Sequence, residues 1–598
     1  MSADDAIPGH PTPLQVFGAA TVPEALALAA AGPSGITVID RELAEQNLPY
    51  AQLASSARRA AALLAAHGVG RGDRVALVSS TSPAMLVSLF GIWHAGAVPT
   101  ILPPPHRIDE LPETMRELDR RLDFVGARCV VVADALHRFV TRRLRDTGRP
   151  VLTCGELAAA QAPGTEKPAA GPDDLAHLQF TSGTTGPGRA VPLTHRQILT
   201  NAAASWDRLG ARTGESVLVN WLPLYHDMGL VSFLGMVAGG GRAVLQPPEE
   251  FLRHPDSWVD ALSVHRATHT VAPDFAYGLA ARSMTERPRP LDLSALRMCG
   301  DGAEPIRLGN VEAFTTAGAR YGLRPEALTP MYGLAEATLA VALPRFDEPL
   351  RCDRVSRTAL TDAAVAEPVP ADDPDARDLA VCGGPAPGVR IAIKDERGTD
   401  LGHRQVGEIC VTGPSVMRGY WNDPEASEQA LRDGWLHTGD LGYLTPEGLV
   451  VCGRLKDMII VGGRNLYPED YEQVAGEVEG AGRLCAAFSL PDPERMVLAA
   501  EIGRTGTPPI ELARSIMTRT RERLGRAPDT VLVVPRHSLP RTSSGKPRRD
   551  HCRTGFLSGR LGELASVTRP GARAPRPRTG PAREDPSGRP GMAPTYAE

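Results

Sequence analysis

The chain has 598 residues, of which 42% are hydrophobic and 23% are charged, and its formal net charge is −5. This composition is typical of a globular protein of two to four domains, and the lack of a basic excess argues against nucleic acid as the main partner. The nine cysteines include no C-x-x-C pair, and no apolar stretch suits a signal peptide or a transmembrane segment, which predicts a cytoplasmic protein with reduced thiols.

Strands and helices are expected to alternate in the first part of the chain. Apolar or β-branched runs typical of strands occupy residues 36–40, 74–79, 97–102 and 129–133. Helical spacing of apolar residues marks 50–67, 83–93 and 110–125. This alternation predicts parallel βαβ units and an α/β fold.

Composition divides the chain into four parts. An irregular start over 1–12 precedes a large domain over 13–455, in which the polar stretch 351–379 is expected to lack regular structure. A compact smaller domain is predicted over 456–565. The remaining residues, 566–598, are rich in Pro, Gly and Arg and are expected to form a disordered tail.

A stretch of glycine and hydroxyl residues is the most distinctive feature. The apolar run 178–180 leads into Thr181, Ser182, Gly183, Thr184, Thr185 and Gly186. Such a loop can turn N–H and hydroxyl groups toward one anion, which predicts phosphate binding, although a flexible surface turn is the alternative. A P-loop NTPase is not supported, because Arg189 and Ala190 replace the required Lys and Ser or Thr.

Histidines suggest two further sites. His226 and Asp227 lie in an otherwise apolar stretch, where a histidine is more often a hydrogen-bonded core residue than a catalyst. His265 and His269 are four residues apart and would share one helix face, as zinc ligands do. No Glu follows His265 and no third ligand is evident, so we expect a structural pair. No G-x-S-x-G segment supports a serine hydrolase.

A series of short motifs runs from Thr181 to Lys546: TSGTTG (181–186), PLYHDMG (223–229), APDFAY (272–277), DGAEP (301–305), YGLAEAT (332–338), TGD (438–440), GRLKD (453–457), GRNLYP (463–468) and PRTSSGK (540–546). In this order they resemble the motifs of the acyl-adenylate-forming superfamily, and most closely those of its fatty acyl-AMP ligases. The chain departs from the family pattern at Gly188, Arg189 and Ala190, which replace Pro, Lys and Gly, and at Asp274 and Asp301, which replace Asn.

The resemblance implies a large N-terminal domain of layered α/β subdomains, a small mobile α+β C-terminal domain, and roles for individual residues. ATP would be bound by Thr181, Ser182, Gly183, Thr184, Thr185, Gly186, Arg189, Gly302, Ala303, Glu304, Tyr332, Gly333, Asp440 and Arg454. Glu336 would hold Mg²⁺ and act in catalysis with Thr181 and the mobile Lys546. Lys456 would be the hinge of the small domain. The acid substrate would be bound by His226, Asp227, Asp274 and Phe275.

The implied reaction joins a carboxylic acid, by family default a fatty acid, to ATP, giving acyl-AMP and pyrophosphate. The acyl group would then pass to an acyl carrier protein supplied in trans, since the chain has no carrier motif. Residues 343–379 are a candidate for the extra segment that hinders use of coenzyme A in these ligases. An acyl-CoA ligase, an enzyme for a polar or amino-bearing acid, and a catalytically weak adenylate-binding protein are the alternatives.

Overall fold

The computed structural model describes residues 12–105, 111–161, 163, 170–181, 188–461, 464–491, 494–504, 506–541 and 546–569. Contacts divide the chain into two compact units, residues 1–458 and 459–598. None of the helices in the described part of the chain is long and apolar enough to cross a membrane.

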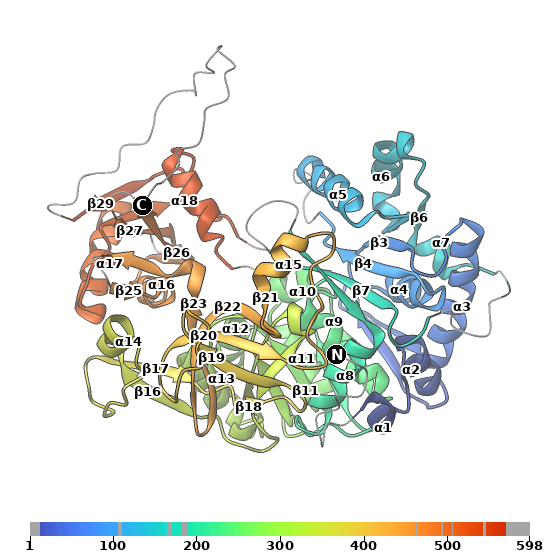
Figure 1. The fold of residues 1–598 in the computed structure, drawn as a ribbon, viewed down its shortest axis with the longest axis horizontal. Helices are drawn as coiled ribbons and strands as arrows, with labels where there is room; N and C mark the ends of the chain where they lie inside the picture. The colour runs from blue at the N-terminus through green and yellow to red at the C-terminus, as the bar shows by residue number, and fades with distance from the viewer. Residues whose placement is uncertain are drawn as a thin grey trace, which may run out of the picture. The chain divides into compact units, whose positions relative to one another are not determined.

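Two mainly parallel sheets form the centre of the larger unit (Figure 1). The first has the strand order β13 (Leu328–Pro330), β12 (Met298–Asp301), β11 (His269–Ala272), β9 (Val217–Asn220), β10 (Arg242–Leu245), β1 (Gly35–Ile39) and β2 (Glu45–Pro49), and only β2 is antiparallel to its neighbour. The second has the order β4 (Val98–Leu102), β3 (Arg74–Val78), β5 (Cys129–Val132) and β6 (Val151–Thr153), all parallel. The predicted α/β fold is confirmed.

Helices separate and cover these sheets. One apolar core joins side chains of both sheets to α2 (Val22–Ala29), α3 (Tyr50–Ala66), α4 (Pro83–His94), α8 (His195–Trp206) and α9 (Asp227–Ala238). A second core packs α11 (Asp256–Val264), α12 (Asp274–Glu286) and α13 (Leu308–Ala319) on the first sheet, and a third packs α5 (Leu111–Val125) and α6 (His137–Leu144) on the second. Helix α4 is apolar on every side and is buried along most of its length, as a helix between two sheets must be. Shorter helices are α1 (Pro13–Phe17), α7 (Cys154–Ala158) and α10 (Pro248–Arg253).

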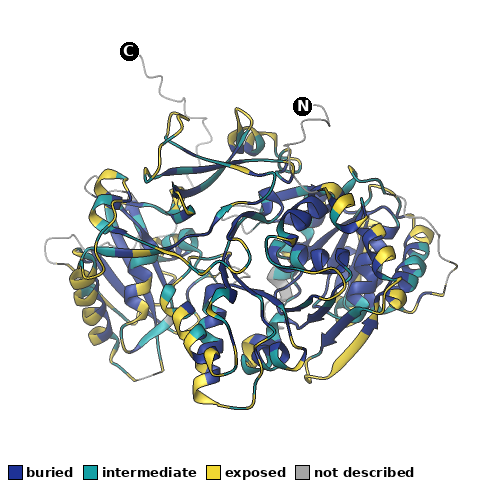
Figure 2. Cartoon of the chain, turned by 90° about the horizontal axis from the view of Figure 1, so that it is seen from below, coloured by how far each residue is buried: buried dark blue, intermediate teal, exposed yellow. Residues whose placement is uncertain are grey.

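The rest of the larger unit consists mainly of antiparallel strands. A hairpin is formed by β7 (Leu175–Phe180) and β8 (Ala190–Thr194). A small sheet contains β14 (Tyr332–Gly333), β15 (Ala340–Leu343) and β18 (Gly384–Pro385). A five-stranded sheet contains β19 (Arg390–Lys394), β20 (Gly407–Thr412), β22 (Trp435–Thr445), β21 (Leu431–Arg432) and β23 (Gly448–Arg454), and α15 (Pro424–Ala430) precedes β21. Figure 2 shows that the strands of the larger sheets are mainly buried, whereas yellow exposed residues gather on outer helix faces and turns.

The polar stretch 351–379 is not structureless, so that prediction was wrong. It contains β16 (Cys352–Ser356), α14 (Arg357–Ala363) and the start of β17 (Ala376–Ala380), which pairs with β16. Its polar side chains explain this order, because Arg354 forms two hydrogen bonds with Asp378 across the strand pair. Asp353 fixes the hairpin to the body of the unit by accepting hydrogen bonds from Arg404 and from the Tyr443 hydroxyl.

The smaller unit is an α+β structure. Its four-stranded sheet has the order β26 (Ala481–Pro491), β27 (Glu494–Ile502), β28 (Thr530–Val534) and β29 (Ala565–Thr568), and β24 (Ile459–Val461) pairs with β25 (Arg464–Leu466). Its helices are α16 (Pro468–Gly476), α17 (Pro509–Leu524) and α18 (Arg549–Leu557). Strand β29 extends beyond residue 566, where the tail was predicted to begin, and residues 570–598 lie outside the described part.

Candidate functional site

The β7–β8 hairpin carries the two ends of the predicted phosphate loop. The Thr181 N–H donates to the Arg189 carbonyl over 2.9 Å, which closes the base of the loop. Gly188 has φ +83°. Proline, which the family pattern has at this place, cannot adopt a positive φ, so the backbone conformation explains the departure from the pattern. Residues 182–187, including the predicted Ser182, Gly183, Thr184, Thr185 and Gly186, lie outside the described part of the chain.

Tyr420 links this loop to Glu336. Its hydroxyl donates to Glu336 Oε1 over 2.8 Å, and the Arg189 guanidinium carbon lies 5.0 Å from the centroid of its ring. Burial raises the pKa of Tyr420, so the phenol keeps its proton and remains a donor. Tyr420 was missed in the sequence, since no spacing rule connects it with residues 84 and more positions away.

Asp440 joins three strands at the position predicted for the ribose. Its Oδ2 accepts a hydrogen bond from the Tyr332 hydroxyl over 2.8 Å, and its Oδ1 accepts one from Arg454 Nε over 2.8 Å. Asp440 and Arg454 are cross-strand partners of β22 and β23. The Asp440 charge raises the pKa of Arg454, and burial together with Asp440 raises that of Tyr332. Both donors therefore keep their protons.

A largely apolar cavity connects the adenine motifs to helices α8 and α9. It contains about 910 Å³ of empty space, the solvent at its open mouth included. Gly302, Ala303, Tyr332 and Gly333 form part of its wall, together with Asp227. The apolar residues of the wall include Trp206, Leu209, Met228, Val231, Met236, Val271, Met298 and Met331. Of the four predicted substrate-binding residues, His226, Asp274 and Phe275 are not among those lining this cavity.

Trp206, one of the residues of the cavity wall, packs closely against a glycine. Trp206, near the end of α8, lies against Gly239, which follows α9, and a Cβ atom at Gly239 would come within 2.1 Å of the Trp206 ring. The neutral polar groups of the wall include His269, whose pKa burial lowers to about 4. Asp227 is therefore the charged side chain of the described lining. The pocket residues Trp206, Met236 and His269 were missed in the sequence, because their grouping depends on the packing of separate elements.

Three carboxyl groups gather beside the adenine motif. Asp274 accepts hydrogen bonds from the Arg307 N–H (2.9 Å) and from Asn310 Nδ2 (2.6 Å), and Glu304 accepts one from the Phe275 N–H. Asp301 is 1% exposed, and neither of its side-chain oxygens has a hydrogen-bond partner among the described residues. Burial raises the pKa of Asp274 to about 7 and that of Asp301 well above its usual range. Burial therefore favours the neutral form of the Asp301 carboxyl.

The D301N variant is expected to be more stable than the wild-type chain, and by more at pH 8 than at pH 5. The folded-state pKa of Asp301 is raised, so its contribution to stability is complete below its unfolded pKa of about 4 and is lost as the pH rises from there to the raised folded-state pKa. The neutral amide removes this loss, a gain on the order of 1–3 kcal/mol at pH 8. Urea unfolding at both pH values measures it.

The exposed Asp292 supplies the control for this pH experiment. It accepts hydrogen bonds from Ser294 and Arg266, which hold its pKa below the usual range. A lowered folded-state pKa contributes stability at pH values above the pKa of the unfolded state. D292N is therefore expected to give no gain in unfolding free energy at pH 8. Equal gains in D301N at pH 5 and pH 8 would contradict the assignment of a neutral buried acid.

His265 and His269 do not share a helix face, so that prediction was wrong. Helix α11 ends at Val264, and Arg266 adopts φ +50°, which reverses the chain before His269 begins β11. His265 forms an ion-pair contact of 3.1 Å with Glu45, whereas His269 Nε2 lies 3.1 Å from the Leu209 carbonyl. The two imidazole rings therefore contact different parts of the protein.

The two predicted lysines lie in different units. Lys456 is exposed in a 3₁₀ turn, Leu455–Asp457, near the end of the larger unit. Lys546 is half-buried in the smaller unit, three residues before α18. Lys456 therefore lies within a short turn, and Lys546 lies just before a helix.

Comparison with known proteins decides the family. A family model described as AMP-binding enzyme matches residues 26–421. The chain belongs to this family. As an AMP-binding enzyme it is an adenylate-forming ligase that uses ATP. The resemblance drawn from the motifs is confirmed.

Relatives of this AMP-binding enzyme include fatty-acid ligases. A putative ligase of Mycobacterium tuberculosis is 36% identical over 84% of this chain and 93% of its own length. A medium-chain-fatty-acid–[acyl-carrier-protein] ligase of Moorena producens is 31% identical over 86% of this chain and 90% of its own. A solved chain from a study of fatty acyl-adenylate ligases of E. coli and L. pneumophila has a TM-score of 0.83 and 32% identity, over 90% of this chain and 97% of that one.

Proposed function

We propose that this enzyme is a fatty acyl-AMP ligase. It activates a fatty acid with ATP to acyl-AMP, releases pyrophosphate, and passes the acyl group to the phosphopantetheine thiol of a separate acyl carrier protein. The observation that carries the proposal is the largely apolar cavity that runs from Gly302, Ala303 and Tyr332 to Trp206. An acyl chain fills such a cavity without leaving polar groups unpaired.

The nucleotide is assigned to the cluster around Asp440. Its carboxylate suits the two ribose hydroxyls, because a carboxylate only accepts hydrogen bonds and has two oxygens. Tyr332, which lines the cavity beside Gly333, offers a ring face to the adenine. Arg189 and Thr181 stand at the base of the phosphate loop, where a cation and a hydroxyl favour the departing pyrophosphate.

Glu336 fits a magnesium ion that accompanies ATP. Its half-buried carboxylate is a hard oxygen ligand, and Tyr420 holds Oε1, which orients the group and leaves Oε2 for the metal. The ion supplies positive charge that neutralises the phosphates when bound. Lys546 is proposed to bridge the carboxylate and the α-phosphate, and Lys456 to be the hinge that brings it there.

The carrier protein is favoured over coenzyme A by the anchored hairpin of β16 and β17. In fatty acyl-AMP ligases an extra segment hinders the domain rotation that coenzyme A requires. Here Asp353 holds that hairpin to the larger unit through Arg404 and Tyr443, which suits a fixed obstacle. A polar or amino-bearing acid is the second candidate substrate, and it is favoured by Asp227, whose charge lies in the cavity wall.

Pyrophosphate release from a series of carboxylic acids, with mass detection of the product, tests the proposal. We expect medium-chain and long-chain fatty acids to give acyl-AMP, which persists with coenzyme A and is consumed by a phosphopantetheinylated carrier protein. The K546A variant is the control and is expected to release little pyrophosphate. Formation of acyl-CoA would reassign the acceptor, preference for amino acids would reassign the substrate, and no turnover with any acid would leave an adenylate-binding protein.

A further inference from the structure

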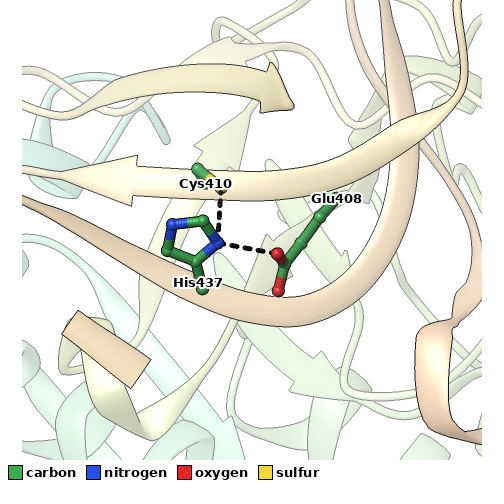
Figure 3. A group of neighbouring side chains, drawn as sticks. All are labelled: Glu408, Cys410 and His437. Carbon is green, nitrogen blue, oxygen red and sulfur yellow. Dashed lines mark hydrogen bonds and ion pairs between the residues drawn. The ribbon is translucent and has the colours of Figure 1, made fainter. Parts of the chain in front are cut away.

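A second cluster of ligand-type side chains lies on β20 and β22, apart from the cavity. Figure 3 shows Glu408, Cys410 and His437, whose side chains converge from these two strands. His437 Nδ1 lies 2.7 Å from Glu408 Oε2 and 3.4 Å from Cys410 Sγ. Within the described part of the chain, these three offer one ligand atom each, all within 4.8 Å of one another.

An irregularity in the strand pairing creates this arrangement. Cys410 faces His437 across the β20–β22 pair, whereas Glu408, two residues earlier, faces Leu441, four residues later. The extra residues of β22 form a bulge, which keeps Glu408 beside the His437 ring. Cys410 is buried, and the side chains of Glu408 and His437 are only 15% and 9% exposed. The three side chains thus converge on one largely buried spot between paired strands.

The Nδ1 atom of His437 has more neighbours than it can hydrogen-bond at one time. Besides Glu408 and Cys410, His437 Nδ1 lies 2.7 Å from an Arg432 guanidinium nitrogen. That nitrogen can only donate, and the Glu408 carboxylate can only accept, while Nδ1 carries either one proton or one lone pair. A cation bound by lone pairs of Nδ1, Sγ and the carboxylate would satisfy all three ligand atoms together.

The ligand set selects the kind of metal. A thiolate, an imidazole and a carboxylate together are typical of zinc, at Zn–S of about 2.3 Å and Zn–N of about 2.0 Å. A tetrahedral ion with these bonds separates S and N by about 3.5 Å, which the 3.4 Å between Cys410 and His437 matches. Glu408 must retreat from His437 by roughly half an ångström. Because the ligand is the thiolate, metal binding would release the thiol proton of Cys410.

We propose that Glu408, Cys410 and His437 bind a divalent metal ion of the zinc class, separate from the magnesium assigned to Glu336. The half-exposed Arg432 occupies the solvent side of the cluster and competes with the ion for His437 and Glu408. It must swing into water when the metal binds, and the fourth position is then open to a water molecule.

Titration of the chelator-treated full chain with Co²⁺, with Mg²⁺ present, tests the site. We expect an intense thiolate-to-cobalt charge-transfer band that Zn²⁺ abolishes by displacement. C410S and H437A are expected to weaken or remove the band. C352S is the matched control and should keep it, because Cys352 is exposed and lies in β16, away from these strands.

Arg432 provides a variant that should act in the opposite direction. R432A removes a competing cation, and we expect it to bind Co²⁺ about tenfold more tightly. This gain cannot come from a folding defect, so it keeps the proposal testable even if C410S folds poorly. Absence of the band from both the wild type and R432A, or its full retention in C410S, would overturn the site. Equal Co²⁺ affinity in R432A and the wild type would contradict the proposed competition between Arg432 and the metal ion.

Discussion

Replacing Asp440 with alanine is expected to lower kcat/KM for ATP by roughly 100-fold or more. The carboxylate accepts one hydrogen bond from a neutral phenol and one from a guanidinium, and it is assigned to the ribose hydroxyls. Its loss leaves Tyr332 without its acceptor in a buried position and frees Arg454. We expect the effect mainly in KM for ATP, measured by pyrophosphate exchange.

Two milder variants separate the roles of the Asp440 cluster. Y332F removes only one neutral donor and keeps the ring, so a loss of about tenfold or less is expected. D440N keeps an acceptor for Tyr332 but turns an N–H group toward Arg454, so it should resemble D440A. An unchanged KM for ATP in D440A, with the thermal midpoint preserved, would contradict the ribose assignment.

The E336Q variant is expected to lower kcat by roughly 100-fold and to raise the Mg²⁺ concentration needed for half-maximal rate. The amide keeps an oxygen for the Tyr420 hydroxyl and nearly the same shape, so the packing around the 3₁₀ turn of Ala335–Ala337 should persist. What is lost is the negative charge that suits a hard cation. A magnesium titration of the initial rate measures both effects.

Tyr420 supplies the comparison for this experiment. Y420F keeps the ring under Arg189 and removes only the hydrogen bond to Glu336, so we expect a loss of about tenfold or less with a smaller change in Mg²⁺ dependence. The double variant should lose less than the product of the two single losses, because both act on one carboxylate. An unaltered Mg²⁺ requirement in E336Q would contradict the metal assignment.

Local patterns predicted most of the helices and strands between residues 36 and 133 of the larger unit. The β-branched run at 36–40 became β1, the alanine-rich stretch at 50–67 became α3, and the apolar stretch at 83–102 became α4 followed by β4. These elements are specified by periodicity and burial, which a single sequence records. The stretch 351–379 was misjudged because its order depends on pairing between Arg354 and Asp378, which are distant in sequence.

The sequence predicted only part of the candidate site. Motif residues such as Asp440, Tyr332 and Arg454 are indeed brought together, because the spacing of a β-hairpin places Asp440 opposite Arg454. Tyr420, the cavity wall and the unpartnered oxygens of Asp301 depend on how separate elements pack. The prediction for His265 and His269 failed for a local reason, because the helix ends at Val264 and Arg266, with positive φ, reverses the chain before β11.

The contact between Trp206 and Gly239 constrains the order in which the largely apolar cavity can change. A side chain at position 239 overlaps the indole ring, so Gly239→Ala has to be deleterious while Trp206 is present. Once Trp206 has been exchanged for a small residue, position 239 becomes free to vary and the cavity deepens. Under the proposed function, enlargement of the cavity for longer acids therefore requires replacement of Trp206 first, and Trp206 cannot return once position 239 has accepted a side chain.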